Sequence, residues 1–129
     1  MTPEETGQLL ARAALIDNRS VDAPTVIAWH EILRDLPYPD CEVALAEHRA
    51  ESTEWLMPAH IRRRVRESRN QRIQDAGGVP APPAELIDNP AAYSAALRAA
   101  ATALADGHDP HVAMQAIARQ AARLELEAS

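Results

Sequence analysis

The stretch Ala76-Gly77-Gly78-Val79-Pro80-Ala81-Pro82-Pro83 divides the chain into two parts of different composition. Its two glycines and three prolines stop a helix, because glycine loosens the backbone and proline lacks the amide hydrogen that helices and central strands need. We expect residues 76–88 to form a linker. The sequence therefore predicts a helical domain over residues 1–75 and a second element over residues 89–129.

Before the linker, apolar residues recur with the spacing of α-helices. Thr2-Pro3-Glu4-Glu5 has the pattern of a capping box with proline at the first helical position, which predicts a first helix over residues 3–17. A second helix is expected to end at Pro37, and the turn at residues 37–40 is expected to start a third. Pro58 is placed to begin a fourth helix that runs to about residue 75.

The core of residues 1–75 is expected to be aliphatic, because the chain of 129 residues contains no phenylalanine. Trp29 and Trp55 are predicted to be its largest side chains. Cys41 and His48 share the apolar face of the third helix, so we interpret them as a buried thiol and a hydrogen-bonded core residue. A single cysteine excludes an internal disulfide and a multi-cysteine zinc site.

After the linker, Asn89-Pro90 and Asp109-Pro110 each predict the start of a helix, with Gly107 as a C-terminal cap between them. Alanine dominates both helices, and alanine favours helix but buries little surface. Such a hairpin is marginal alone, so it is expected to pack on the first domain, on a second copy or on a partner. The candidate partner-binding residues on its apolar stripes are Tyr93, Leu97, Leu104, Met114, Ile117 and Leu124.

These patterns predict an all-α fold without strands. The expected layout is an N-terminal four-helix bundle, a Pro/Gly linker and a C-terminal Ala-rich helical hairpin.

Charge is unevenly distributed along the chain. The formal net charge is -6, yet residues 58–74 contain six arginines and one acid, which makes a basic island between two acidic stretches. On a helix with 100° per residue, Arg62, Arg66 and Arg69 fall within roughly 60° of one another. Guanidinium groups bind phosphates and carboxylates through their forked donors. The candidate residues for binding nucleic acid or an acidic partner are Arg62, Arg63, Arg66, Arg69 and Arg72.

The alternative interpretation of the basic island is a solvated face. In that case its arginines pair with acids of the protein itself, such as Glu47, Glu51 and Glu54.

No catalytic arrangement stands out in the sequence. It contains no HExxH, no GxSxG, no glycine-rich phosphate loop and no lysine. The run at residues 106–111 has metal-compatible side chains, but Gly-His and Asp-Pro also suit a turn between helices, and we expect no metal site. We therefore expect a protein that is not an enzyme and has no cofactor. The acidic N-terminus and the lack of a long uncharged run predict a cytoplasmic protein.

Residues 1–65 contain a distinctive order of short motifs. The successive motifs are Val26-Ile27-Ala28-Trp29-His30-Glu31-Ile32-Leu33, Leu36-Pro37-Tyr38-Pro39, Val43-Ala44-Leu45 with His48, and Pro58-Ala59-His60-Ile61-Arg62. This order resembles the small helical domain of phage replicative helicase loaders. The long arginine run and the C-terminal hairpin depart from that pattern.

The resemblance implies a non-enzymatic adaptor of DNA replication. Such loaders bind a hexameric replicative helicase, often hold it inactive, and deliver it to an initiator protein on origin DNA. In that family the helicase contact is associated with the region after the helical domain, which corresponds by position to the residues after the linker here. Two alternatives stay open: a small DNA-binding regulator that uses the arginine-rich fourth helix, and a phage assembly protein that oligomerises through the last two helices.

Overall fold

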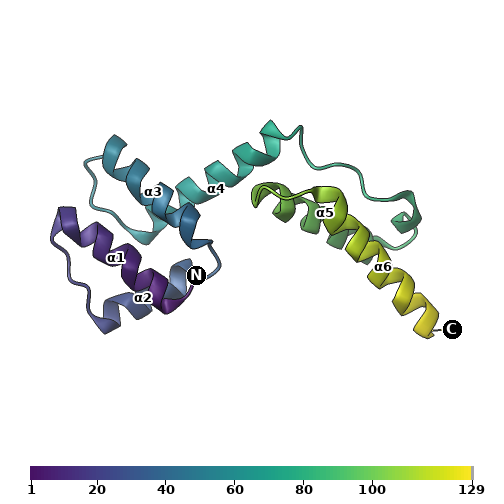
Figure 1. The fold of residues 1–129 in the computed structure, drawn as a ribbon, viewed down its shortest axis with the longest axis horizontal. Helices are drawn as coiled ribbons and strands as arrows, with labels where there is room; N and C mark the ends of the chain where they lie inside the picture. Colours follow the sequence, from purple (N-terminus) through teal and green to yellow (C-terminus); the bar gives the residue numbers. More distant parts are fainter. Residues whose placement is uncertain (129) are drawn as a thin grey trace. The chain divides into compact units, whose positions relative to one another are not determined.

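The computed structural model describes residues 1–128, and every regular element among them is a helix (Figure 1). The elements are α1 (Pro3–Asp17), α2 (Ala23–Leu33), α3 (Tyr38–Glu51), α4 (Pro58–Asp75), the 3₁₀ helix η1 (Ala84–Leu86), α5 (Pro90–Ala105) and α6 (Pro110–Ala128). The predicted all-α class is confirmed. The chain forms two compact units, which we call unit 1 (Met1–Glu67) and unit 2 (Ser68–Ser129).

α1, α2 and α5 begin where a side chain accepts a hydrogen bond from an amide of the first turn. The capping box predicted at the N-terminus is confirmed: Glu5 donates its amide to Thr2 Oγ1 at 3.1 Å, and Thr2 donates its amide to Glu5 Oε1 at 2.8 Å. Asp22 and Asn89 cap α2 and α5. Each side-chain oxygen accepts the amide hydrogen three residues ahead, at 2.9 and 3.2 Å.

The end of α2 differs from the prediction, because α2 ends at Leu33 rather than at Pro37. α3 begins at Tyr38, so residues 37–40 start this helix as predicted. Proline is tolerated in a first turn because those amides have no acceptor within the helix. Pro39 occupies such a position.

Unit 1 has a core of large aliphatic side chains. The buried members are Leu9, Leu10, Ala13, Trp29, Leu33, Cys41, Ala44, Leu45, Leu56, Ile61 and Val65. The predicted environments of Cys41 and His48 are confirmed. Cys41 has no exposed surface, and burial raises the pKa of its thiol to about 12. His48 is 3% exposed and donates its Nε2 hydrogen to the Glu54 carbonyl oxygen at 2.7 Å.

Trp55 is not the core side chain that the sequence predicted. It is 54% exposed, whereas Trp29 is 9% exposed. Trp55 lies in the loop between α3 and α4, where no helical spacing directs its side chain inward. The guanidinium carbon of Arg19 lies 4.3 Å from the centroid of its ring and covers part of it.

Unit 2 contains the last turns of α4 together with η1, α5 and α6. α5 and α6 pack against each other, and Gly107 has the left-handed φ of 79° that suits glycine after a helix C-terminus, as predicted. The buried cluster consists of Leu86, Ala96, Ala100 and Met114. Leu86 belongs to η1, so the expected linker at residues 76–88 is partly packed. The two compact units divide within α4, and the domain limits drawn from the sequence stay a prediction.

Candidate partner-binding surfaces

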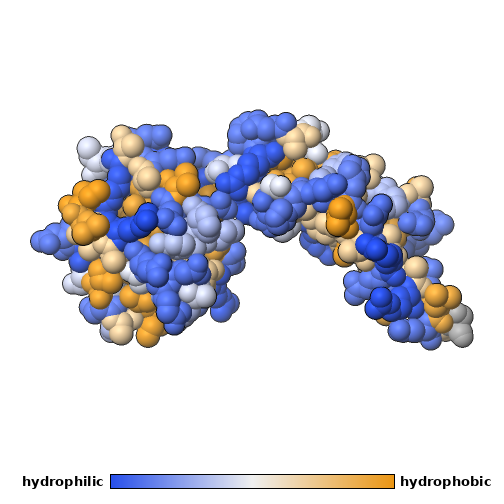
Figure 2. All heavy atoms as spheres, viewed as in Figure 1, coloured by the Kyte–Doolittle hydropathy of each residue, from blue (hydrophilic) through white to orange (hydrophobic). Residues whose placement is uncertain are grey.

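Large apolar side chains are exposed in each unit. Figure 2 shows hydrophobic atoms over the C-terminal end of α1 and at the C-terminal end of α6. At the first position Leu15 is 86% exposed and Ile16 is 72% exposed. At the second, Leu124 is 57% exposed and Leu126 is 78% exposed. Exposed apolar side chains in groups are typical of surfaces that bind a partner.

The arginines of α4 in unit 1 are partly engaged by the protein itself. Arg62 donates to the two carboxylate oxygens of Asp35 at 2.6 and 3.1 Å and to the Ile32 carbonyl oxygen at 2.8 Å. This hydrogen-bonded pair lowers the pKa of the Asp35 carboxyl and raises the pKa of Arg62. Arg64 pairs with Glu51 at 2.9 Å. Pairing with the protein's own acids, the alternative interpretation, is therefore confirmed for these two arginines.

The other candidate arginines divide into two groups. In unit 2, Arg69 bonds Asp106 at 2.7 Å and Arg72 donates to the Ala105 carbonyl oxygen at 2.7 Å. In unit 1, Arg63 and Arg66 are exposed, and neither forms an ion pair within residues 1–128. Two exposed arginines of unit 1 thus keep guanidinium groups that are available to a partner.

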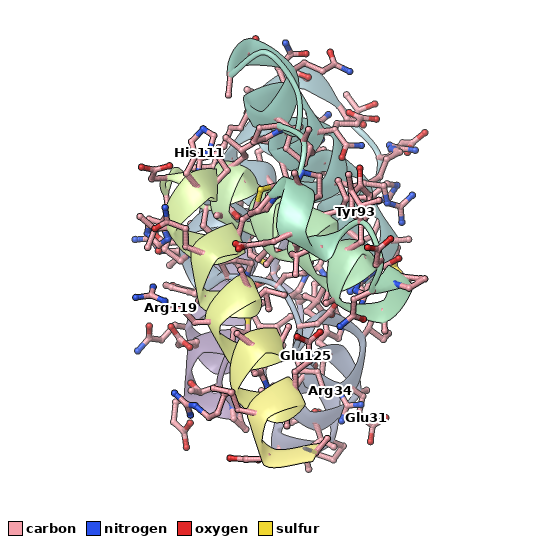
Figure 3. All side chains as sticks on the ribbon, turned by 90° about the vertical axis from the view of Figure 1, so that its right-hand side faces the viewer. Glu31, Arg34, Tyr93, His111, Arg119 and Glu125 are labelled. Carbon is pink, nitrogen blue, oxygen red and sulfur yellow. The ribbon has the colours of Figure 1, made fainter. Side chains whose placement is uncertain are left out.

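α6 has a polar side and an apolar side. Figure 3 shows His111 and Arg119 extending outward from this helix, and both residues are exposed. Met114 and Ile117 lie on the side that packs against α5. The amphipathic pattern of α6 therefore directs Met114 and Ile117 toward α5 and leaves His111 and Arg119 exposed.

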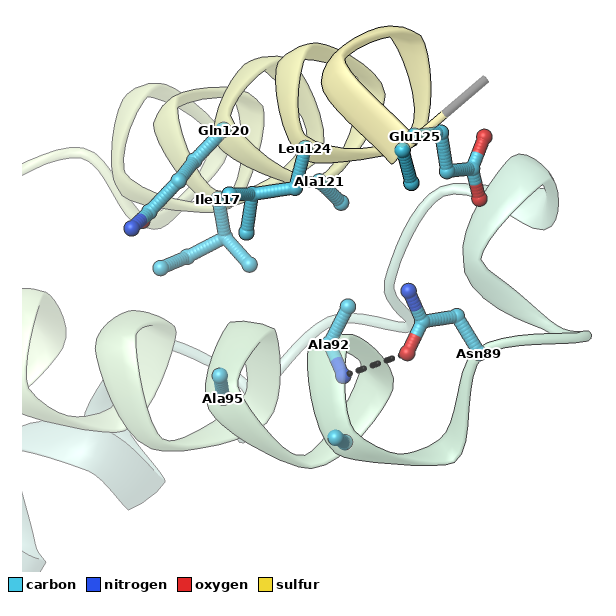
Figure 4. A pocket seen from close by; sticks show the side chains of 10 residues that line it. Asn89, Ala92, Ala95, Ile117, Gln120, Ala121, Leu124 and Glu125 are labelled. Atoms are coloured by element: carbon cyan, nitrogen blue, oxygen red, sulfur yellow. Dashed lines mark hydrogen bonds between the residues drawn. The ribbon is translucent and has the colours of Figure 1, made fainter.

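A groove of about 430 Å³ lies between α5 and α6. Figure 4 shows Ile117 and Leu124 of α6 directed toward Ala92 and Ala95 of α5. The alanine side chains are too short to fill the space between the two helices, which leaves the groove open. Its polar border is formed by Asn89, Gln120 and Glu125.

The six predicted partner-binding residues are not all available. Leu104 and Met114 are 9% and 1% exposed, and the prediction is corrected for them because they are buried inside unit 2. Tyr93 is partly buried, and Leu97 is 36% exposed without lining the groove. Ile117 and Leu124 come together in the groove. The sequence reasoning missed Ala92 and Ala95, although small residues at helical spacing were the available signal.

A second concavity, of about 470 Å³, lies in unit 1 and was not predicted. We call it the α1–loop pocket. Its lining includes Ile16 and Asp17 from α1, His48 and Arg49 from α3, and Trp55 from the loop that follows. No local sequence motif predicts this pocket, because the residues that line it come from three separate segments of the chain.

Asp17 organises the charged part of the α1–loop pocket. Its carboxylate accepts hydrogen bonds from Arg19 Nε at 2.9 Å and from Arg49 Nη2 at 2.9 Å. Burial alone would raise the pKa of Asp17, but the hydrogen bonds and charges of Arg19 and Arg49 outweigh burial and lower it. The same Arg19 guanidinium lies over the rings of Trp29 and Trp55, with 5.2 and 4.3 Å to the ring centroids.

Two histidines fix the loop that carries Trp55. The rings of His48 and His60 are stacked with their centroids 4.6 Å apart. His60 Nδ1 accepts the Met57 amide hydrogen at 2.9 Å, and its Nε2 lies 3.1 Å from Glu54 Oε2. The loop is thereby tied to α3 and α4 on both sides of Trp55.

Within residues 1–128, no three His, Cys, Asp or Glu side chains are grouped so that they could hold a metal ion. The run at residues 106–111 forms the connection between α5 and α6 and the first two residues of α6, and Asp109 accepts the His111 amide hydrogen at 2.8 Å. None of the helices described here combines the length and the apolar run required to cross a membrane.

Comparison of the chain with protein-family models, with curated proteins and with solved structures finds no match.

Proposed function

We propose that the protein is a non-enzymatic adaptor of DNA replication, of the phage helicase-loader type. It binds a hexameric replicative helicase through unit 2 and helps to deliver the helicase to DNA. The observation that carries the proposal is the α5–α6 groove, which is apolar along its floor and polar at its border. The resemblance of residues 1–65 to the loader family supports this choice of partner.

The groove has the features that a helical segment of a partner requires. An amphipathic helix inserts its apolar face into such a groove, and its polar residues meet the polar border. Leu124 is 57% exposed, and complete burial of a leucine side chain contributes about 2 kcal/mol. A partner can bury only the exposed 57% of this side chain, about 1 kcal/mol, so removing the contact alone should weaken binding by about fivefold, and a charge placed there should weaken it further.

Binding rather than chemistry also agrees with the state of the single thiol. Cys41 is buried and keeps its proton, since its pKa is about 12. A protonated buried thiol is a poor nucleophile.

The test is size-exclusion chromatography of the whole chain with the cognate replicative helicase at micromolar concentration. We expect co-elution, a loss of at least about tenfold in affinity for Leu124→Glu, and unchanged affinity for Val112→Glu. Val112 is a matched control because it is 60% exposed on the same helix and does not line the groove. A wild-type chain that does not co-elute would contradict the proposal. Self-association instead, abolished by Leu124→Glu, would favour the assembly-protein alternative.

A second candidate function, direct DNA binding, is favoured by one observation. Arg63 and Arg66 are exposed and form no ion pair within residues 1–128. Their contact with phosphates would weaken steeply with salt. A gel shift at about 50 mM salt should show binding that is lost in the double variant Arg63→Ala/Arg66→Ala. No shift of the wild-type chain at that salt would exclude this function.

A further inference from the structure

We infer that the outer face of α2 in unit 1 is a dimerisation surface, on which α2 of a second copy of the chain packs in the antiparallel direction. The inference is independent of the function proposed for unit 2. It rests on an outer face that is mostly apolar, on two unpaired side chains of opposite charge on this face, and on their spacing.

α2 is apolar on both of its sides. Its inner side contributes Trp29 and Leu33 to the core of unit 1. On its outer side, Ile27 is 57% exposed and Ile32 is 46% exposed. A surface helix of a globular protein has one apolar side, and a helix that is apolar all round is normally buried all round. The outer side of α2 is therefore expected to be covered.

The exposed residues of α2 form one continuous face. At 100° per residue, Ile27 and Ile32 lie about 140° apart around the helix. Between them lie three further exposed residues, Pro24, Ala28 and Glu31. Helices that cross at small side chains approach each other closely, and Ala28 provides such a position on this face.

Glu31 and Arg34 supply the charges of this face. Both residues are exposed, and Figure 3 shows their side chains extending outward from α2. Neither side chain forms an ion pair within residues 1–128. Because they are three positions apart, they lie about 60° from each other around the helix. A face that carries an unpaired acid next to an unpaired base is complementary to a copy of itself.

Antiparallel packing about a two-fold axis brings these charges together. Parallel helices would place Glu31 beside Glu31 of the second copy. In an antiparallel pair centred near residue 30, Ala28 lies opposite Ile32 of the second copy, and Glu31 is about 7.5 Å along the axis from the other Arg34. Helical side chains lean toward their own N-terminus, so these two lean toward each other. The symmetry makes every contact occur twice.

The size and charge of the interface set its expected strength. The overlap is about two helical turns, so it buries less than the roughly 800 Å² per partner of a standard interface. The formal charge of -6 on each copy opposes association, but salt at about 0.15 M screens charges that are more than about 8 Å apart. We expect a weak dimer with a Kd on the order of 100 µM.

The first part of the test is sedimentation velocity of the whole chain at about 0.15 M salt, over about 10 to 500 µM. We expect a reversible equilibrium between monomer and dimer. Ile27→Glu should raise the Kd at least about tenfold, because the dimer contains this residue twice. Val43→Glu is the matched control, since Val43 is 51% exposed on α3 of the same unit and should leave the Kd unchanged. Circular dichroism checks that each variant keeps its helix content.

The second part is a charge-reversal series that tests the antiparallel pairing. Glu31→Arg and Arg34→Glu should each weaken the dimer severalfold, because each brings like charges together. The double variant Glu31→Arg/Arg34→Glu should restore the Kd to within about twofold of the wild-type value. An equimolar mixture of the two single variants should form a heterodimer, since one carries two positive charges on this face and the other two negative charges.

Three results would overturn the inference. The first is a wild-type chain that stays monomeric at about 500 µM. The second is a dimer that Ile27→Glu leaves intact; its loss in Leu124→Glu would then place self-association in unit 2. The third is a double charge variant that associates no better than the single variants, which would exclude the antiparallel pairing. The helicase takes no part in these measurements, so their outcome is separate from the test of the proposed function.

Discussion

Unit 1 and unit 2 are both helical, but they bury different side chains. The fully buried residues of unit 1 include Leu9, Leu10 and Leu33, whereas the buried cluster of unit 2 contains two alanines beside Leu86 and Met114. Burial of aliphatic carbon atoms contributes most of the free energy that favours folding, and an alanine side chain contributes little of it. The helices of unit 1 are therefore stabilised mainly by the burial of apolar side chains. Those of unit 2 depend more on the intrinsic helix propensity of alanine and on their helix caps. Unit 2 has more stability to gain from a partner.

The two units can be observed separately in one sample. Trp29 and Trp55 are the two tryptophans of the chain and both belong to unit 1, so tryptophan fluorescence reports the unfolding of unit 1. Far-ultraviolet circular dichroism reports the helices of both units. We expect the two signals to give different urea transitions, with part of the helix signal lost before the fluorescence changes. Coincident transitions would contradict a difference in stability.

The largest effect is expected for Leu10→Ala in unit 1. Leu10 has no exposed surface, and removing a buried leucine side chain costs about 3 kcal/mol of the free energy of unfolding. Urea unfolding followed by tryptophan fluorescence measures this loss. Leu15→Ala is the control on the same helix, and at 86% exposure it should change the free energy by less than about 0.5 kcal/mol.

A somewhat smaller effect is expected for Met114→Ala in unit 2. Met114 is 1% exposed and is the large side chain that α6 contributes to the buried cluster, so its loss should cost about 2 kcal/mol. Circular dichroism should show the early transition at lower urea, and the fluorescence midpoint should stay unchanged. A shift in the fluorescence midpoint would mean that the two units unfold together.

Acid should weaken unit 1 through Asp17. The pKa of this carboxyl is lower in the folded chain than its ordinary value of 3.8, so its ion pairs with Arg19 and Arg49 contribute fully above the unfolded value. That contribution is lost as the pH falls below 3.8 and through the folded pKa. The fluorescence midpoint in urea should therefore decrease more between pH 5 and about pH 2 for the wild-type chain than for Asp17→Asn. Equal decreases would contradict this role.

The smallest effects are expected for the helix caps, one in each unit. Asp22→Ala removes the cap of α2 and Asn89→Ala removes the cap of α5, each at a cost of about 1 kcal/mol. The first should move the fluorescence midpoint, and the second only the early transition in circular dichroism. The same cost should unfold a larger fraction of unit 2, because that unit has less stability to lose. Equal increases in the unfolded fractions of unit 1 and unit 2 would contradict the expected difference in stability between the two units.

Local signals in the sequence were sufficient for the helices but not for the sites. Pro58, Asn89 and Gly107 marked element ends correctly, because caps and breakers act within a few residues. The end of α2 was wrong, since proline is compatible with a helix start as well as a helix stop. The pairing of Arg62 with Asp35 joins residues far apart in sequence. Such contacts depend on the fold and leave no periodic pattern.

The linings of the two concavities could be predicted only in part, because they too combine residues that are far apart in the sequence. In the α5–α6 groove, Ile117 and Leu124 were found as members of an apolar stripe, while the alanines opposite them were not. In the α1–loop pocket, Trp55 was expected in the core, because hydrophobicity alone does not say which large side chains stay outside.

The sealed position of Cys41 has a practical consequence. A thiol without exposed surface and with a pKa of about 12 does not react with an alkylating reagent until the structure around it opens. Since the chain has one cysteine, the slow rate of its modification at neutral pH measures how often unit 1 opens transiently. Measured with and without a bound partner, that rate would show whether an event at the far end of the polypeptide is felt at this thiol.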